Sequence, residues 1–547
     1  VASLVGSEMC IRDRTNADFH RLSGEEMAGP VRDITIVGGG TAGWLTAIVL
    51  VTYLKWRPGA DDTKITLVES PNVPTVGVGE ATVPGMAYIL RQCGIDEGEF
   101  FRRTNATFKM GVLFRHWNRW PDGSPRDFFT PFNIPHALAG HSPGYAFQRH
   151  RGHPQEDFVD AVSPTLALVS RLKGPRRLQD DASQSMGYAY HLDAGLFAAF
   201  LKEEATARGV THILENVTAV NQDERGYISS LTLEESGDHP VELVIDCTGF
   251  RGMIVNGALE EPFISYGNHL LNDSAAAVQI PHADSTKLTP FTSSHALTAG
   301  WVWNVPLYNR VGTGYVFSSA FKSDDEAKSE LLQHLGPLAE GHEPRILRMR
   351  VGRARRSWVK NCVAIGLSGG FIEPLEATAI YMIEMATRYL TSGWPTTDFP
   401  EPVSNAFNKK MVALQEEIRD FILLHYRLNN RDEPFWQAAR NDVDVPDALL
   451  ERLELWRHLL PNQQDLGLTE LFNFWNYQFV LFGKGFYDHG ELALGFTASE
   501  EAWEQYQAGL LDQKRNMVAH LPDHWDLINH IRGDNGSALE SSHDAIL

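Results

Sequence analysis

The chain has few cysteines, no long apolar run and too few basic residues to balance its acidic ones. Four cysteines in 547 residues form no disulfide framework, so a reducing cytoplasm is the expected compartment. No unbroken apolar run reaches the roughly 20 residues that span a membrane, so no membrane association is predicted. A formal net charge of -21 disfavours a nucleic-acid partner, because phosphate contacts need clustered Lys and Arg. We also predict no bound metal.

Length and composition indicate a folded chain of more than one ordinary domain. With 547 residues, 43% hydrophobic and 21% charged, the chain buries a large core and does not resemble a disordered protein. Residues 1–30 are expected to be a disordered or non-native leader. Within them, residues 1–14 resemble a translated sequencing-adaptor artefact and lack the apolar segment of a signal peptide. Regular patterns begin near Val31.

A glycine-rich turn lies between a predicted strand, residues 33–37, and a predicted apolar helix, residues 45–54. In that context the glycines let the backbone approach a pyrophosphate, and the helix N-terminus offers free N–H groups. A second strand, residues 64–68, ends at Glu69, a carboxylate placed to accept hydrogen bonds from a ribose. The pattern favours a bound dinucleotide over a purely structural turn. The turn residues predicted to bind it are Gly38, Gly40, Thr41, Ala42 and Gly43.

Two later strands also run into glycine-containing turns. Three strands are predicted in the middle of the chain, at residues 213–220, 228–233 and 241–245. The last runs into the turn 246–252, which contains Gly249. Another apolar run, residues 362–365, ends at Gly366. Three strand-to-glycine junctions far apart in the sequence favour one extended ligand, such as FAD, over a single phosphate.

Residues 77–84 are rich in glycine and end in a proline, which argues against a central strand. We interpret them as a mobile strap beside the ligand, with Glu80 and Ala81 near the cofactor. A plain loop explains this segment nearly as well.

Lys109 stands in an apolar run, residues 108–114, that is predicted to be one strand. Alternation sends the large apolar side chains to one face and Lys109, with Gly111 and Leu113, to the other. Such a lysine is either a solvated charge at a sheet edge or a buried functional group.

Glu373 and Glu376 lie in a segment predicted to open a helix after Gly370. Acidic residues near a helix N-terminus are explained by capping and by the helix dipole. The functional alternative is that the N–H groups of Thr378 and Ala379 hold an anion there.

Trp301 and Trp303 alternate along a predicted strand that ends at Pro306, so both indoles lie on one face. Such a pair is more often core than catalytic. From about residue 390 onward the pattern changes to long helices, for example at residues 407–424 and 447–460. The sequence therefore predicts an α/β core with a mostly helical C-terminal cap.

Together these strings resemble those of the flavin-dependent tryptophan halogenases. The matching strings are GGGTAGW at 38–44, GVGEAT at 77–82, DCTGFRG at 246–252 and EPLEAT at 373–378. The segment W-x-W-x-V-P at 301–306 resembles the W-x-W-x-I-P signature that separates these halogenases from flavin monooxygenases. The resemblance runs from about residue 34 to at least residue 487. It implies a Rossmann-like FAD-binding core similar to that of the flavin monooxygenases.

The resemblance also implies a reaction divided between two sites. A separate NAD(P)H-dependent reductase supplies FADH2, and with oxygen the bound chloride or bromide is oxidised to hypohalous acid. This acid travels through an internal tunnel, past Trp301, Trp303 and Pro306, to Lys109, which hydrogen-bonds it or forms a haloamine. Glu376 orients the halogenating species and takes the proton lost by the arenium ion. Confinement matters because free hypohalous acid oxidises methionine, cysteine and tryptophan indiscriminately.

The halide site departs from the family pattern at two positions. Ala377 and Ala379 stand where the family usually has serine and glycine. Because the backbone N–H groups of Thr378 and Ala379 remain, halide binding is expected to persist. The lost hydroxyl at Ala377 and the added methyl at Ala379 are expected to alter halide affinity or preference.

The substrate site implied by the resemblance is only partly present. Glu470 matches the carboxylate that receives the ammonium of free tryptophan, and Phe132, Phe474 and Trp475 match its aromatic walls. As an alternative, Phe474 and Trp475 are core residues of an amphipathic helix. Thr130 replaces a histidine that stacks on indole. Residues 463–464 are glutamines where a pair of tyrosines is usual.

The expected substrate is therefore tryptophan, another indole or an electron-rich arene. The expected organisation is an FAD-binding and halide-activating α/β domain at residues 31–390 and a helical substrate-binding cap at residues 391–547. Two other functions stay open, a flavin monooxygenase and a non-catalytic flavin-binding protein. The reductase is expected to act as a diffusive partner, and the resemblance leaves a homodimer open.

Overall fold

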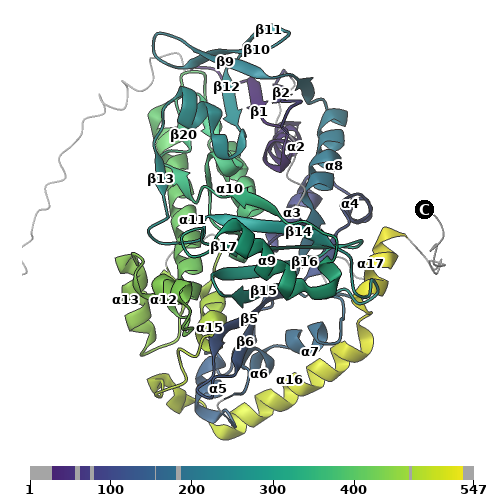
Figure 1. The fold of residues 1–547 in the computed structure, drawn as a ribbon, viewed down its shortest axis with the longest axis vertical. Helices are drawn as coiled ribbons and strands as arrows, with labels where there is room; N and C mark the ends of the chain where they lie inside the picture. The colour runs from purple at the N-terminus through teal and green to yellow at the C-terminus, as the bar shows by residue number, and fades with distance from the viewer. Residues whose placement is uncertain are drawn as a thin grey trace, which may run out of the picture.

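The computed structural model describes residues 28–55, 62–73, 79–153, 155–179, 186–466 and 471–533. A six-stranded sheet lies at the upper end of the molecule in Figure 1 and has the order β20-β21-β12-β1-β2-β8. Neighbouring strands are parallel, except β20 and β21. The strands are β1 (Asp33–Val37), β2 (Lys64–Glu69), β8 (Thr211–Leu214), β12 (Leu243–Asp246), β20 (Trp358–Val359) and β21 (Cys362–Ala364).

Helix α2 (Thr41–Lys55) packs on β1 and β2 of this sheet, beside two further helices, α8 (Ala194–Ala207) and α10 (Ala379–Ser392). Helix α2 packs against both α8 and α10. The central strands β1 and β2 are apolar and buried along almost their whole length, as expected of parallel strands covered by helices. The β1–α2–β2 unit and the parallel sheet make this end of the molecule Rossmann-like.

A seven-stranded sheet forms the middle of the molecule, in the order β18-β14-β17-β16-β15-β5-β6. Its strands are antiparallel, except that β15 runs parallel to β5. They are β5 (Gly111–Arg119), β6 (Pro125–Pro131), β14 (Ser274–Ile280), β15 (Thr292–Leu297), β16 (Gly300–Pro306), β17 (Val311–Phe317) and β18 (Arg345–Arg348). Helix α9 (Asp324–Leu335) packs on β14 and β17.

Three small sheets complete the strand structure of the described residues. One of them, in the order β3-β7-β4, carries Lys109 at its edge. Its strands are β3 (Gly79–Ala81), β4 (Thr107–Lys109) and β7 (Ala189–Asp193). The other two consist of β9 (Val217–Gln222), β10 (Ile228–Leu233) and β11 (Gly237–Pro240), and of β13 (Phe263–Ser265), β19 (Gly352–Ala354) and β22 (Gly370–Phe371).

Two predicted strands are each divided between two sheets. The predicted strand 213–220 is wrong as one element, because Asn216 turns the chain between β8 and β9 and bonds Ser70 and Glu234 with its side chain. The predicted strand 108–114 breaks at Met110. The N–H of Met110 donates to Pro290, and its carbonyl accepts from Phe132. Gly111 and Leu113 therefore belong to β5 and not to the strand of Lys109.

The described residues after β22 contain helices and no strand. The predicted helix 407–424 lies within α11, and the predicted helix 447–460 begins as α13 but ends four residues early. Besides α10, the α-helices of this part are α11 (Glu401–Arg427), α12 (Pro434–Asn441), α13 (Asp447–Trp456), α14 (Gln463–Leu466), α15 (Phe474–Gly483), α16 (Glu500–His520) and α17 (His524–Arg532). Helices α5 (Gly144–His150), α6 (Phe158–Val162) and α7 (Thr165–Val169) join them at the lower end of the molecule (Figure 1).

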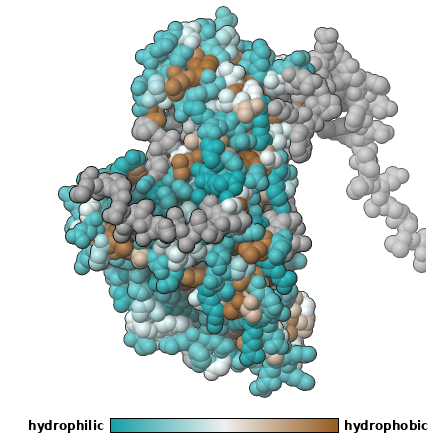
Figure 2. Space-filling view, turned by 90° about the vertical axis from the view of Figure 1, so that its right-hand side faces the viewer, coloured by the Kyte–Doolittle hydropathy of each residue, from teal (hydrophilic) through white to brown (hydrophobic). Residues whose placement is uncertain are grey.

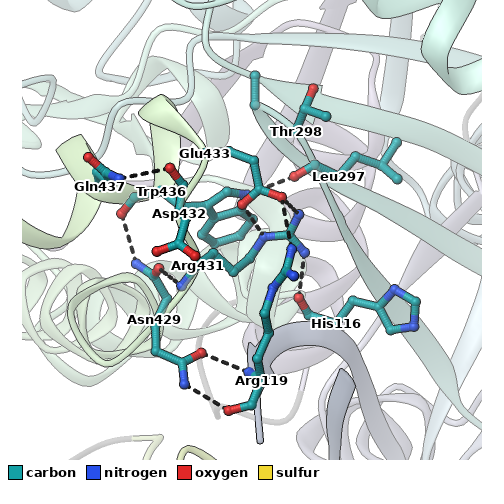
Figure 3. A network of polar contacts seen from close by, with 12 residues as sticks. His116, Arg119, Leu297, Thr298, Asn429, Arg431, Asp432, Glu433, Trp436 and Gln437 are labelled. Atoms are coloured by element: carbon teal, nitrogen blue, oxygen red, sulfur yellow. Dashed lines mark hydrogen bonds and ion pairs between the residues drawn. The ribbon is translucent and has the colours of Figure 1, made fainter. Parts of the chain in front are cut away.

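A polar network binds the turn after α11 to the seven-stranded sheet (Figure 3). Arg431 donates to the carbonyl of His116 in β5 at 2.6 Å and pairs with Glu433 at 2.5 Å. The indole N–H of Trp436 donates to the carbonyl of Leu297 in β15 at 2.7 Å. These contacts fix the C-terminal end of α11 against β5 and β15.

The face of the molecule shown in Figure 2 is largely hydrophilic, with hydrophobic residues in small separate groups. Across the residues that the structure describes, no helix has the length and apolar character needed to cross a membrane.

Candidate functional site

The three strand-to-glycine junctions meet at one edge of the six-stranded sheet. Strands β21, β12 and β1 are neighbours and parallel, so their carboxyl ends share that edge. The turn after β1 begins with Gly38, the turn after β12 contains Gly249, and the turn after β21 begins with Gly366. All three glycines have positive φ. The sequence predicted the strands, and the sheet order brings their turns together.

The turns approach one another so closely that side chains do not fit. A Cβ at Gly38 would lie 2.2 Å from the carbonyl oxygen of Cys247, and one at Gly366 would lie 2.6 Å from the Cβ of Ala42. Helix α2 begins directly after this turn, at Thr41, and presents its N-terminus to the same edge. The resulting glycine cradle fits a dinucleotide pyrophosphate.

Glu69 ends β2 beside this cradle. A Cβ at Gly39 would lie 2.2 Å from the carboxylate carbon of Glu69, so the carboxylate abuts the glycine turn. Its Oε2 lies 2.9 Å from Nε2 of His212 and 3.4 Å from Nζ of Lys202. These two partners were not predicted from the sequence, because they come from β8 and α8, far along the chain.

The strap segment is described only from Gly79 onward, so residues 77 and 78 lie outside the described part. Glu80 and Ala81 belong to β3, which pairs with β7. Burial, with Asp193 nearby, raises the pKa of Glu80 to about 7. The segment is therefore a short strand at this point.

Lys109 is the last residue of β4 and is 1% exposed. It is a buried lysine, and not a solvated charge at the protein surface. Its Nζ donates to the carbonyl of Thr82 at 3.1 Å and lies 5.3 Å from the ring centre of Phe132. Because Thr82 belongs to the strap segment and directly follows β3, the strap contacts the lysine.

The charge of Lys109 is opposed by burial and supported by a carboxylate. Burial lowers the pKa of Lys109 to about 8, while the nearby charge of Glu376 acts in the opposite direction. The structure therefore brings together two residues that are more than 260 positions apart in the chain. An amine with this pKa is partly neutral near neutral pH.

Glu376 ends a 3-10 turn, Pro374–Glu376, and is also buried. Its Oε1 lies 2.9 Å from Nε2 of His425 on α11. Burial lowers the pKa of His425, whose ring stacks on Phe114 at 4.7 Å. The two atoms are close but do not meet hydrogen-bond geometry, so the imidazole packs beside the carboxylate. Because burial favours the neutral imidazole, Lys109 remains the cationic neighbour of Glu376.

The helix predicted to open after Gly370 begins at Ala379, so helix capping does not explain the two glutamates. Glu373 is fully buried and accepts hydrogen bonds from the amide of Asn272 at 3.0 Å, the indole of Trp301 at 3.3 Å and the hydroxyl of Tyr426. Burial raises the pKa of Glu373 to about 7. It holds Trp301 in place.

Trp301 and Trp303 lie on one face of β16, with ring centres 6.5 Å apart. Pro306 ends this strand, and its carbonyl accepts a hydrogen bond from the hydroxyl of Thr107 at 2.6 Å. The tryptophan strand is therefore bonded directly to the strand of Lys109. The ring centre of Trp301 also lies 6.4 Å from that of Trp117.

Thr378 and Ala379 stand at the N-terminus of α10. The first N–H groups of a helix have no partner within it. The hydroxyl of Thr378 is buried and makes no hydrogen bond with any described residue. These groups, with the left-handed turn at Ala377 (φ 56°), have the chemistry of a small anion site.

Of the predicted substrate residues, Phe132 lies beside Lys109. Phe474 and Trp475 begin α15, with their ring centres 5.0 Å apart. Trp475 is buried and stacks on Phe479 of the same helix, as a core residue does. Glu470 lies outside the described residues. Among the residues that are described, no group of His, Cys, Asp and Glu is placed to hold a metal ion.

Comparison with known proteins decides the family. The family model described as tryptophan halogenase matches residues 33–495. The chain belongs to the tryptophan halogenase family. It is therefore a flavin-dependent halogenase with an α/β Rossmann-like core and a helical C-terminal region. Flavin and halide use follow from this membership, and the glycine cradle fits the flavin cofactor.

Individual relatives cover nearly the whole chain. Tryptophan 7-halogenase RebH of Lentzea aerocolonigenes is 37% identical over 93% of this chain and 100% of its own. Tryptophan 6-halogenase ThaL of Streptomyces albogriseolus is 36% identical over 93% and 100%. A solved tryptophan halogenase from Shewanella frigidimarina has a TM-score of 0.86 at 32% identity, over 93% of this chain and 99% of that chain.

Besides His212 and Lys202, three residues near Lys109 and Glu376 were missed in the sequence analysis. His425 lies in the apolar run of α11, one residue beyond the predicted helix, where a lone histidine gives no signal. Thr82 contributes only its backbone carbonyl to Lys109, and Trp117 packs between Trp301 and His425. Such contacts have no signature in sequence spacing.

Proposed function

We propose that this enzyme uses FADH2 from a separate reductase, oxygen and chloride or bromide to halogenate tryptophan, another indole or an electron-rich arene. Lys109 delivers the electrophilic halogen, and Glu376 takes the proton that the ring loses. One observation supports these roles above the others: Lys109 is a buried amine, fixed by the carbonyl of Thr82, with the charge of Glu376 acting on it.

The glycine cradle, with Gly38, Gly249 and Gly366, would hold the pyrophosphate, and Glu69 the ribose. Reduced flavin with oxygen would supply the oxidising equivalent that turns halide into hypohalous acid. Thr378 and Ala379 would hold the halide at the N-terminus of α10.

Trp301 and Trp303 would keep organic substrates away from the flavin and form the wall along which hypohalous acid reaches Lys109. The hydrogen bonds that hold this wall, from Trp301 to Glu373 and from Thr107 to Pro306, support the assignment.

At Lys109 the neutral and charged amines do different chemistry. The ammonium donates a hydrogen bond to hypohalous acid and polarises it. The neutral amine forms an N–halogen bond and releases water. In either case the ring carbon gains halogen and loses one proton to the carboxylate of Glu376. The oxygen of hypohalous acid leaves as water by taking a proton from the ammonium, and the nitrogen of the haloamine takes up a proton to regenerate the amine. The placement of the ring near Lys109 selects the carbon that reacts.

The experiment that tests this proposal is Lys109→Ala, assayed with reductase, FAD, NADH and bromide. We expect halogenated product to disappear while FAD binding and hydrogen peroxide formation persist, because the change affects delivery and not flavin chemistry. The isotope pattern of bromine identifies the product. Halogenation at the wild-type rate in this variant would exclude Lys109 from the mechanism. A product that gains oxygen and not bromine would indicate a monooxygenase instead.

The substrate class is supported by Phe132, whose ring lies beside Lys109 and offers a wall for a flat arene. Two relatives of this enzyme are named as a tryptophan 7-halogenase and a tryptophan 6-halogenase. Thr130, in β6, replaces the histidine that stacks on the indole of tryptophan in the family. Other indoles and electron-rich arenes are therefore proposed as substrates beside tryptophan. A panel of free indoles, phenols and pyrroles, with products identified by mass, decides among them.

A further inference from the structure

The strand that carries Lys109 has one edge without a strand partner. Strand β4 pairs with β7 on one side only, with Phe108 opposite Tyr190. The N–H of Phe108 points to the other edge and is buried there. A buried backbone N–H without an acceptor is strongly unfavourable. The residue before Lys109 therefore needs an acceptor from outside the sheet.

The C-terminal helix α17 supplies that acceptor. Nε2 of His524, the first residue of α17, accepts the Phe108 N–H at 3.1 Å. Its Nδ1 lies 2.9 Å from the carbonyl of Leu288. Because a carbonyl only accepts, the imidazole carries its proton on Nδ1 and leaves Nε2 free for Phe108. The side chain is 0% exposed, and burial lowers its pKa to about 4, which keeps it neutral.

Helix α17 is itself held firmly. Trp525 stacks on Tyr308 with ring centres 5.1 Å apart and an angle of 4°. The hydroxyl of Tyr308 donates to Asn529 at 3.0 Å, and Arg532 donates to the carbonyl of Phe101 at 2.7 Å. The helix thus contacts α4 (Glu97–Thr104), which precedes β4, and the segment that follows β16 (Figure 1).

The other hydrogen bonds around β4 come from the core. The hydroxyl of Thr107 lies 3.0 Å from Nδ1 of His191 and donates to the carbonyl of Pro306. On the far side of Lys109, Met110 donates to Pro290. The Phe108 N–H is thus the contact of this strand that depends on the C-terminal helix.

The geometry points to His524 as a positioning residue for halogen delivery: by accepting the Phe108 N–H, it fixes the strand so that the next side chain, Lys109, reaches Thr82 and Phe132. This inference rests on the proposed function of Lys109. It gives the C-terminal helix a role in the transfer of halogen from Lys109 to the arene, and not in the flavin reaction at the glycine cradle.

Two substitutions of the same residue separate this role from simple docking of α17. In His524→Gln, the side-chain oxygen reaches the place of Nε2 and still accepts from Phe108. In His524→Asn, the side-chain amide reaches the place of Nδ1 and still donates to Leu288, but the Phe108 N–H loses its acceptor. His530→Asn, on the exposed side of the same helix, is the matched control.

For each variant, FADH2 oxidation, brominated arene and free hypobromous acid are measured in one assay, the last with a soluble β-diketone trap. We expect His524→Asn to lower brominated arene per FADH2 oxidised on the order of 10- to 100-fold, with more trapped hypobromous acid and unchanged flavin oxidation. His524→Gln and His530→Asn should stay near wild type. Coupling here is the amount of brominated arene formed per FADH2 oxidised. Equal coupling in the Asn and Gln variants, or a fall in coupling in the Gln variant alone, would overturn the inference.

Hydrogen exchange tests the contact without any activity. A peptide that contains Phe108 should exchange faster in His524→Asn and at the wild-type rate in His524→Gln. Unchanged exchange in both variants would overturn the contact. If His524→Asn fails to fold, as thermal melting would reveal, loss of coupling in a folded His524→Gln still contradicts the inference. A wild-type enzyme that halogenates no arene would instead refute the proposed function and leave the exchange result standing.

Discussion

Lys109 is a lysine in surroundings that oppose its charge. It is buried at the end of β4 with one carbonyl as its hydrogen-bond partner and the charge of Glu376 nearby. Burial of an amine without a direct ion pair lowers stability, and folded proteins keep such residues mainly at functional sites. The same environment makes the amine partly neutral at physiological pH, which an ordinary lysine is not.

The unfavourable burial of Lys109 predicts a variant that is inactive but more stable. Its pKa falls from 10.5 to about 8 on folding, so at pH 7 the burial costs about 3 kcal/mol. Loss of the bond to Thr82 offsets about 1 kcal/mol of this. Lys109→Met should therefore raise the free energy of unfolding by about 2 kcal/mol at pH 7. Urea unfolding measures the difference.

The sign of the pH dependence is fixed by the direction of the shift. Between pH 8 and 10.5 the unfolded lysine binds more protons than the folded one, so wild-type stability rises with pH across this window. The advantage of Lys109→Met should shrink over the same window. Lys409→Met, at an exposed position on α11, is the control and should change neither value. A Lys109→Met variant less stable than wild type at pH 7 would show that burial does not oppose this charge.

Glu376 and Glu373 offer a comparison within one motif. Glu376→Gln removes the proposed proton acceptor, and we expect turnover to fall around 100-fold. Glu373→Gln keeps an oxygen that accepts from Trp301 and Tyr426, which both bond Oε1, and loses only the acceptor for Asn272, so the fall in turnover should be much smaller. Steady-state rates of product formation measure both. Similar losses in the two variants would mean that Glu376 acts only as a structural group.

At the scale of elements, two of the glycine junctions, at Gly38 and Gly366, are predicted to tolerate no side chain. A Cβ at Gly38 or Gly366 would approach within 2.2 Å of Cys247 or 2.6 Å of Ala42. Gly38→Ala should therefore weaken FAD binding severely, as measured by flavin fluorescence titration. Gly509→Ala, on the exposed face of α16 with no atom near its Cβ, is the matched control. It should leave FAD binding unchanged and stabilise the helix by about 0.5–1 kcal/mol. Wild-type FAD affinity in Gly38→Ala would place the cofactor elsewhere.

Elements with a clean pattern were predicted well. Strands β1 and β10 have the predicted bounds, because each is a short apolar or alternating run between polar turns. The strand of Lys109 was predicted too long. Residues 108–114 alternate without interruption, but the chain changes sheets at Met110, whose N–H and carbonyl bond to Pro290 and Phe132. Local periodicity carries no information about which sheet a residue joins.

At the scale of the whole molecule, the described residues hold one glycine cradle for a dinucleotide, at the edge of the six-stranded sheet. We propose that reducing equivalents arrive as FADH2 from a separate reductase. We expect chemically reduced FAD, supplied under controlled oxygen, to support halogenation without any reductase. Rates should also be equal with unrelated reductases that deliver FADH2 at the same flux. A strict requirement for one reductase would instead indicate a specific complex.

The sequence by itself determined the family, the glycine turns and the two acid–base candidates, because each is a short string whose chemistry depends on neighbours along the chain. Only the tertiary structure decided that Lys109 is buried, that the charge of Glu376 acts on it, that His425 lies beside Glu376, and that His524 bonds the strand of Lys109. Those contacts join β4, the turn before α10, α11 and α17. Burial and hydrogen bonding between such distant segments arise from packing, which leaves no periodic trace in the sequence.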